Sequence, residues 1–290
     1  MDSIVINSST NQELVSFIEK PSQAIGIVGV NGSGKRTLVQ WLTSKLLQIN
    51  FDKVTTYPYY LDISPVNDSI SIEEIRNTQK FLKLKTPEDD RLIRRVAVIE
   101  HAEVMTREAQ NALLKQLEEP PNDTVFILTL DNVHGILPTV LSRLTTINIH
   151  KPSKTQIISF FSAMKNSESD INKAYLLSGG LIGSMSSFLT EGETEKTEIT
   201  IGEVKELLVM SKLDRLLSID KLYVKKDDLK QFIQMLIQMS QGTIIQTASK
   251  NDNQSLSKWK RILSLAYDAK VALQKNAQPK LVLMDLLINL

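Results

Sequence analysis

The chain contains no cysteine among its 290 residues and only three histidines. Without cysteine it can form no disulfide bond and cannot hold a cysteine-ligated zinc ion. An excess of either charge is also missing, because 34 Lys and Arg residues face 33 Asp and Glu residues and leave a net charge of +1. We therefore do not expect the protein to bind nucleic acid through bulk positive charge, although a local basic surface is compatible with this balance.

Long apolar runs are missing as well. No run approaches the roughly 18 residues that a membrane span needs, and the start "MDSIVINSSTNQELVSF" lacks the basic and apolar regions of a signal peptide. These absences predict a cytoplasmic protein without a membrane contact. The chain is 42% hydrophobic and 23% charged, which is typical of a soluble globular protein, and its length favours two domains or three small ones.

The first half of the chain alternates strand-like and helix-like segments. Short apolar runs at 24–29, 95–100 and 124–130 are typical of buried strands, and 37–47 and 106–121 carry apolar residues at helical spacing. Strands that alternate with helices predict an α/β fold with a parallel sheet, whose ligand lies at the carboxyl ends of the strands.

The pattern changes after Pro152. Residues 153–189 read as short helices around the glycine-rich "LLSGGLIGSM", and the acidic stretch 190–203 reads as a linker. The remainder, 204–290, has helical spacing. Its apolar candidates for a domain core or an interface, between which the sequence does not distinguish, are Phe232, Leu236, Leu263, Leu265, Val282 and Leu286.

The segment "GVNGSGKRT" (29–37) fits the phosphate-loop pattern G-x-x-x-x-G-K with Gly29, Gly34 and Lys35. Backbone N–H groups and Lys35 would face a phosphate there, or the glycines simply form a turn that opens a helix without a ligand. Arg36 stands where a serine or threonine holds magnesium, and the Thr37 hydroxyl points about 100° further round the helix. Binding of ATP or ADP therefore stays open.

A second departure follows the strand at 95–100. An ATPase has Asp-Glu there, to hold magnesium and to position the attacking water, whereas this chain has Glu100-His101. Glu100 could reach a cation only imperfectly, and His101 is either a poor replacement for the glutamate or a packed residue that caps the strand. Since general-base catalysis contributes roughly 10²–10⁴-fold, these departures together with Arg36 predict slow or absent ATP hydrolysis.

Arginines and a lysine complete the candidate residues. Ser142 and Arg143 follow a short apolar run, and Arg143 is either a solvated side chain or an arginine finger that acts on a neighbouring subunit's γ-phosphate. The cluster Arg91, Arg94 and Arg95 is expected on a solvated face. Lys115 lies on the polar face of the 106–121 helix and could approach DNA.

The segment 98–144, "VIEHAEVMTREAQNALLKQLEEPPNDTVFILTLDNVHGILPTVLSRL", resembles the delta-prime subunits of bacterial DNA polymerase III clamp loaders, which are AAA+ proteins. The likeness continues through "LLSGGLIGSM" to the tail "ALQKNAQPKLVLMDLLINL". It implies a RecA-like AAA+ domain at 1–152, a small helical lid domain at 153–198 and an all-α collar domain at 199–290.

The resemblance also implies a role. The chain would be a non-catalytic member of a five-subunit ring that loads the sliding clamp onto primer-template DNA, with ATP bound at the tau/gamma motor subunits. It would also contact the delta subunit. Arg143, placed by Ser142, would complete a neighbour's active site. No cofactor would be required.

Several residues depart from the family pattern. A cysteine-bearing zinc insertion is absent, because 48–62 is too short for it, so we predict no zinc or other metal. Leu144 stands where cysteine is common and is expected only to pack. The stretch 180–183 offers no lid arginine for the chain's own site. Two alternatives remain: an active P-loop ATPase motor subunit that tolerates Arg36, and a scaffold in which Arg143 does nothing.

Overall fold

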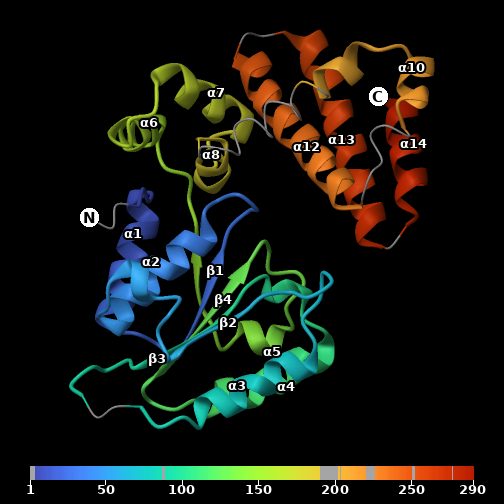
Figure 1. Cartoon of the computed structure of the whole chain (residues 1–290). Coiled ribbons are helices and arrows are strands. Elements are labelled where there is room, and N and C mark those ends of the chain that lie inside the picture. Colours follow the sequence, from blue (N-terminus) through green and yellow to red (C-terminus); the bar gives the residue numbers. More distant parts are fainter. Residues whose placement is uncertain are drawn as a thin grey trace. The chain divides into compact units, whose positions relative to one another are not determined.

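The computed structural model describes residues 4–86, 89–189, 202, 204–219, 226–249, 252–275 and 277–290. The chain divides into two compact units, Met1–Ile157 and Ile158–Leu290 (Figure 1). The first is an α/β unit and the second is helical in its described residues.

The first unit contains a five-stranded parallel sheet in the order β2-β3-β4-β1-β5. The strands are β1 (Ala24–Val28), β2 (Tyr60–Ile63), β3 (Arg95–Ile99), β4 (Thr124–Leu130) and β5 (Thr145–Asn148). Because all strands run the same way, the residues that follow them gather at one edge of the sheet. The parallel α/β sheet that the sequence predicts is confirmed.

Helices cover both faces of this sheet (Figure 1). The alternating side chains of β4 show why: Val125 and Ile127 pack with α1 (Ser8–Glu19) and α2 (Lys35–Leu47), whereas Phe126 and Leu128 pack with α3 (Ile72–Leu82) and α4 (Arg107–Glu118). All seven residues of β4 are buried. The central strand therefore belongs to two apolar cores, as its continuous apolar sequence predicts.

Side chains cap three helices of the first unit. Asn7 accepts a hydrogen bond at the start of α1, Ser71 and Glu74 form a capping box on α3, and Thr106 caps α4. Pro138 is the first residue of the short helix α5 (Pro138–Leu141), where its missing N–H has no helical partner to lose. The proline pair Pro120-Pro121 follows α4.

In its described residues, the second unit is built from helices. They are α7 (Glu168–Ser178), α8 (Ile182–Leu189), α10 (Lys212–Leu217), α12 (Lys226–Ser249), α13 (Asn253–Gln274) and α14 (Pro279–Asn289), while α6 (Lys154–Ala163) spans the boundary between the units. Gly179 and Gly180 have positive φ angles of 60° and 75° and end α7. In this unit α12 packs along α13, and α7 also contacts α12.

The apolar candidates of the tail have separate positions. Leu236 and Leu286 are fully buried, and Phe232 and Val282 are almost so. Leu263 and Leu265 are only half-buried, since Ile262 and Ala266 supply the inward face of α13. The predicted linker and the boundary between lid (153–198) and collar (199–290) fall outside the described residues, apart from Gly202, and that division stays a prediction.

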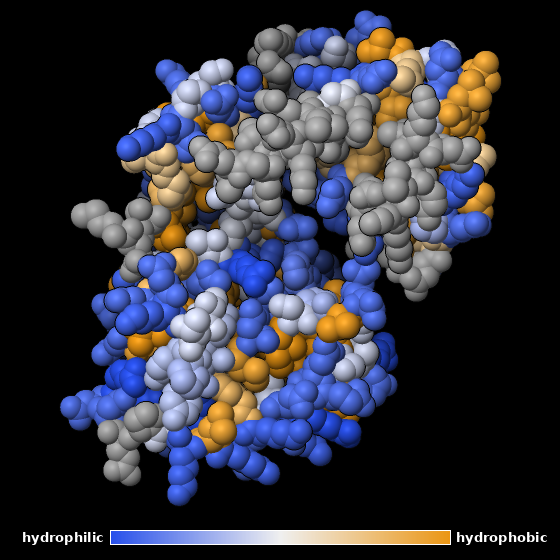
Figure 2. Space-filling view, in the orientation of Figure 1, coloured by the Kyte–Doolittle hydropathy of each residue, from blue (hydrophilic) through white to orange (hydrophobic). Residues whose placement is uncertain are grey.

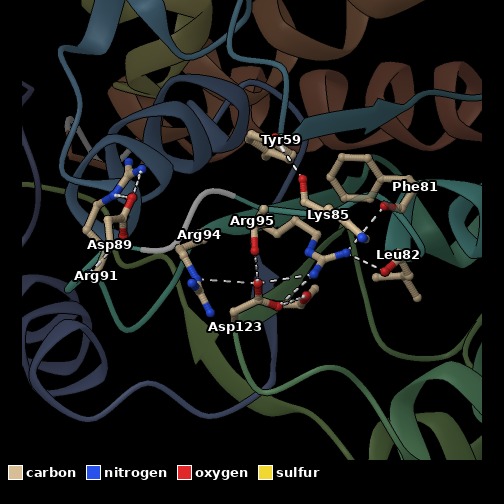
Figure 3. A network of polar contacts seen from close by, with 11 residues as sticks. Tyr59, Phe81, Leu82, Lys85, Asp89, Arg91, Arg94, Arg95 and Asp123 are labelled. Atoms are coloured by element: carbon tan, nitrogen blue, oxygen red, sulfur yellow. Dashed lines mark hydrogen bonds and ion pairs between the residues drawn. The ribbon is translucent and has the colours of Figure 1, made fainter.

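The expectation of a solvated arginine cluster at 91–95 is wrong for Arg95. Its guanidinium is buried and donates to Asp123 Oδ1 at 2.9 Å and to the Leu82 carbonyl (Figure 3). Arg94 Nε lies 3.5 Å from the same carboxylate, and Arg91 pairs with Asp89. The cause is tertiary: Asp123 directly precedes β4 and meets the start of the neighbouring strand β3.

Candidate functional site

The glycine loop joins β1 to α2 and has a shape that depends on its glycines. Gly32 and Gly34 have φ angles of +82° and +89°, which other residues rarely adopt. A Cβ on Gly29 would lie 2.8 Å from Ser33 Oγ and 3.1 Å from Ile149 Cβ. In this described segment no side chain caps α2, so the N–H groups of its first turn face the loop.

Lys35 already has a carboxylate partner within the chain. Its Nζ lies 2.7 Å from Asp131 Oδ1 and donates at 2.7 Å to the Gly29 carbonyl oxygen. Lys35 is only 7% exposed, and Asp131 directly follows β4. The ammonium group that would meet a phosphate is therefore neutralised from the neighbouring strand.

Arg36 also lies near carboxylates, but its side chain is 68% exposed. Its Nε lies 3.4 Å from Glu100 Oε1 and its Nη2 lies 3.9 Å from Asp62 Oδ2. Ser64 donates to the other Glu100 oxygen at 3.2 Å. Burial raises the pKa of Asp62, the charge of Glu100 raises it further, and Arg36 lowers it. The guanidinium thus serves as the cation beside these two carboxylates.

The residues do not fit the magnesium site of a P-loop ATPase. Magnesium takes oxygen ligands, and its loop ligand is a hydroxyl, whereas position 36 presents a positive group that occupies Glu100. The hydroxyl-bearing Thr37 is in the first turn of α2 and its side chain is exposed. The structure brings Gly29, Gly34 and Lys35 together as the motif predicts, but each basic residue faces a carboxylate of its own chain.

His101 contacts Thr129, Glu103 and Asp131. Its backbone φ angle is 51°, and its backbone N–H donates to Thr129 Oγ1 at 2.9 Å. Its ring Nδ1 lies 3.2 Å from Glu103 Oε1. This hydrogen bond raises the pKa of His101 above its ordinary value, and the charge of Asp131 adds to the effect. His101, Glu103 and Asp131 could offer ligand atoms to a metal ion, but the Lys35 ammonium already competes for Asp131.

Ser142 and Arg143 follow α5 and form a separate group. Arg143 Nη2 donates to Glu118 Oε1 at 2.8 Å, and its Nη1 donates to the Thr139 carbonyl at 2.9 Å. Ser142 Oγ donates to the same carbonyl at 3.1 Å. The Arg143 side chain is 37% exposed, so its guanidinium is ordered against α4 and α5 while it remains open to solvent. Leu144, as expected, packs against the core.

Gln110 positions α5, although the sequence did not single it out. This glutamine of α4 is 3% exposed. Its Nε2 donates to the carbonyls of Gly135 and Met105, and its Oε1 accepts from the Leu137 N–H at 2.7 Å. The only signal in the sequence is a polar residue beside the apolar face of a helix. Gln110 thereby fixes the segment that leads to Arg143.

A family model described as DNA polymerase III, delta subunit, matches residues 7–153, just over half of the chain. The chain belongs to this family. The delta-family match covers the whole sheet, the glycine loop and Arg143.

Named relatives agree with the family. The chain is 30% identical over 117 residues to DNA polymerase III subunit delta' of Haemophilus influenzae, covering 39% of this chain and 35% of the relative. It is 31% identical over 133 residues to the protein of the same name from Pseudomonas aeruginosa, covering 40% of each. The matched segments thus span well under half of these relatives. Replication factor C subunit 5 of Saccharomyces cerevisiae is 25% identical over 194 residues, 55% of this chain and 54% of the relative.

A solved structure shows the fold of this delta-family chain. The crystal structure of a gamma-subunit-related protein of DNA polymerase III from Thermotoga maritima matches with a TM-score of 0.53 and 20% identity. The match covers 95% of this chain and 96% of that one. The first unit therefore has an α/β RecA-like fold. Among the described helices, none has the length and apolar character that crossing a membrane requires.

Proposed function

We propose that the chain is the non-catalytic delta-prime subunit of a DNA polymerase III clamp loader. In this role it helps ATP-driven loading of the sliding clamp onto primer-template DNA. Family membership and the order of the motifs support the assignment. The partners are the tau/gamma motor subunits and the delta subunit, with clamp and DNA reached through the assembled complex.

The pairing of Arg36 with Glu100 carries the proposal that this chain does not hydrolyse ATP. In phosphoryl transfer, metal ions bridge the phosphate oxygens and neutralise their developing charge. Here the guanidinium of Arg36 lies 3.4 Å from the acid that would bind the metal, and Lys35 is held by Asp131. Lys35 is thus neutralised by a carboxylate of the same chain, and the exposed Arg36 puts a positive charge beside the acid that would bind the metal.

Arg143 acts on the neighbouring subunit's nucleotide in this proposal. Its partly exposed guanidinium is held at the end of α5 by Glu118 and Thr139, which suits a group that must reach across an interface. An arginine finger contributes 10³–10⁵-fold to the rate where it has been measured, an effect of about 4–7 kcal/mol. Ser142 shares the Thr139 carbonyl and keeps the turn closed.

The second unit supplies the lid and the collar in this proposal. On its surface Leu213 and Leu217 of α10 and Leu281 of α14 are 67%, 70% and 59% exposed, and α10 packs on α14. Figure 2 shows apolar side chains gathered over these helices. Exposed apolar surface of this kind is suited to contacts with other subunits.

ATP hydrolysis tests the proposal. The purified chain is assayed alone, and then with motor subunits, delta, clamp and primed DNA, in each case as wild type and as Arg143→Ala. Arg76→Ala removes another exposed arginine of the same unit, on α3, and is the matched control. We expect no turnover by the chain alone, and a loss of about one active site's share of the mixture's turnover with Arg143→Ala only.

Each contrary result has a distinct meaning. Steady turnover by the chain alone, abolished by Lys35→Ala, would establish the alternative, an active P-loop ATPase motor subunit, for which the intact glycine loop is the supporting observation. If the mixture that contains Arg143→Ala were as active as the wild-type mixture, the chain would act as a scaffold and would supply no arginine finger.

A further inference from the structure

The ion pair between Arg143 and Glu118 joins two elements that lie far apart in the sequence. Glu118 is the last residue of α4, and Arg143 follows α5 by two positions. The Nη2–Oε1 distance is 2.8 Å, and the side chains are 37% and 51% exposed. The guanidinium therefore has an anionic partner on an open surface.

One guanidinium cannot serve two anions equally well. While the Glu118 carboxylate lies beside it, much of the Arg143 charge is neutralised, and a phosphate brought to the same group would be repelled by Glu118. The electrostatic effect of an arginine finger depends on positive charge aimed at the transferring phosphoryl group. The finger becomes fully effective only after the pair with Glu118 has opened.

Exposure makes this opening easy. Ion pairs between exposed side chains are weak, corresponding to at most about a five-fold change in an equilibrium constant. A triphosphate carries several charges, so it competes effectively against one exposed carboxylate. The Thr139 carbonyl, which accepts from Nη1 at 2.9 Å, is neutral and does not compete for the charge of Arg143.

We propose that Glu118 is the intramolecular counter-ion of Arg143, which the γ-phosphate of a neighbouring subunit's nucleotide displaces on assembly. This inference rests on the proposed function, because it needs Arg143 to act in trans. Glu118 is then a positioning residue: it keeps the finger ordered in the free subunit and weakens its attraction to other anions.

The test measures how motor-subunit ATPase depends on the concentration of this chain, with delta, clamp and primed DNA present. Removing the charge with Glu118→Gln removes the competitor, so we expect the half-maximal concentration to fall about two- to five-fold at an unchanged maximal rate. Glu118→Asp, which restores the carboxylate, should behave as wild type. Glu119→Gln changes the adjacent exposed carboxylate and is the matched control, and thermal melting checks that each variant folds.

A double-mutant cycle assigns the effect to Arg143. In the Arg143→Ala background, Glu118→Gln should no longer shift the half-maximal concentration for the remaining ATPase. The inference is overturned if Glu118→Gln leaves this concentration unchanged or raises it, or if it lowers the maximal rate. If Arg143→Ala itself has no effect, the proposed finger fails first, so the two failures are distinguishable.

Discussion

Arg36 stands where an active P-loop ATPase has serine or threonine. Its guanidinium lies near the carboxylates of Glu100 and Asp62. The motif alone predicts the positions of Gly29, Gly34 and Lys35. It does not predict Asp131 or Asp62, because these carboxylates follow or belong to other strands and reach the loop only through the order of the sheet. Partners of this kind are tertiary information, which local spacing does not contain.

The protonation of His101 should make the unfolding free energy of the protein depend on pH. Because its folded-state pKa is raised by Glu103 and Asp131, its stabilising contribution is complete below the unfolded pKa of about 6.5 and is lost as pH rises through the folded value. From about pH 6 to pH 8, the unfolding free energy of wild type should therefore fall more than that of His101→Gln. Urea unfolding at each pH measures it, with His134→Gln, an exposed histidine outside the cluster, as control. Parallel profiles for wild type and His101→Gln would contradict the prediction.

Among the elements, the strands with strong apolar runs were predictable and the edge strands were not. β1, β3, β4, α2 and α4 all lie where the sequence predicts them. β5 has a single buried residue, Ile147, and β2 buries only Ile63. Short edge strands carry little apolar signal, so neither β2 nor β5 was predicted. The helices α1 and α3 were not predicted either.

The buried Arg95–Asp123 pair should contribute strongly to the unfolding free energy. It ties the end of α3, through the Leu82 carbonyl, to the start of β4. Although burial opposes it, hydrogen bonds from Thr86 and Arg95 keep the pKa of Asp123 low. Arg95→Met would leave this carboxylate buried without its main partner, at a cost of about 3–5 kcal/mol in unfolding free energy.

Chemical denaturation of the chain measures this cost. Arg94→Met removes a more exposed neighbour at a longer distance from Asp123 and should cost much less. Equal effects of the two substitutions would show that burial of the pair does not decide its contribution.

At the scale of the whole molecule, two units share one chain, and both expose apolar side chains. In the helical unit these include Leu213 and Leu217 of α10 and Leu281 of α14. The sequence predicts the change of character after Pro152, yet it could not separate core from interface in the tail, because both need apolar residues at the same helical spacing. On α13, for example, Ile262 and Ala266 are buried, whereas the neighbouring Leu263 and Leu265 are only half-buried.

The exposed Leu213 allows a test of whether α10 forms part of an interface. Leu213→Asp places a charge on the apolar surface of α10, so under the proposed function we expect at least about a ten-fold weaker association with the motor subunits and unchanged thermal melting. Leu92 of the first unit is also 67% exposed, and Leu92→Asp is therefore a closely matched control. Size-exclusion binding assays compare them, and equal binding by both variants would count against an interface on α10.

The strand β4 carries an acidic residue at each end, Asp123 directly before it and Asp131 directly after it, and each pairs with a buried cation. Since every residue of this strand is buried, its amide hydrogens should exchange with solvent only when the whole sheet unit unfolds. The exposed pair of Arg143 and Glu118 can instead open in a local fluctuation. We therefore expect the ion pairs at the two ends of β4, each with a buried cation, to open far less often than the exposed pair beside α5.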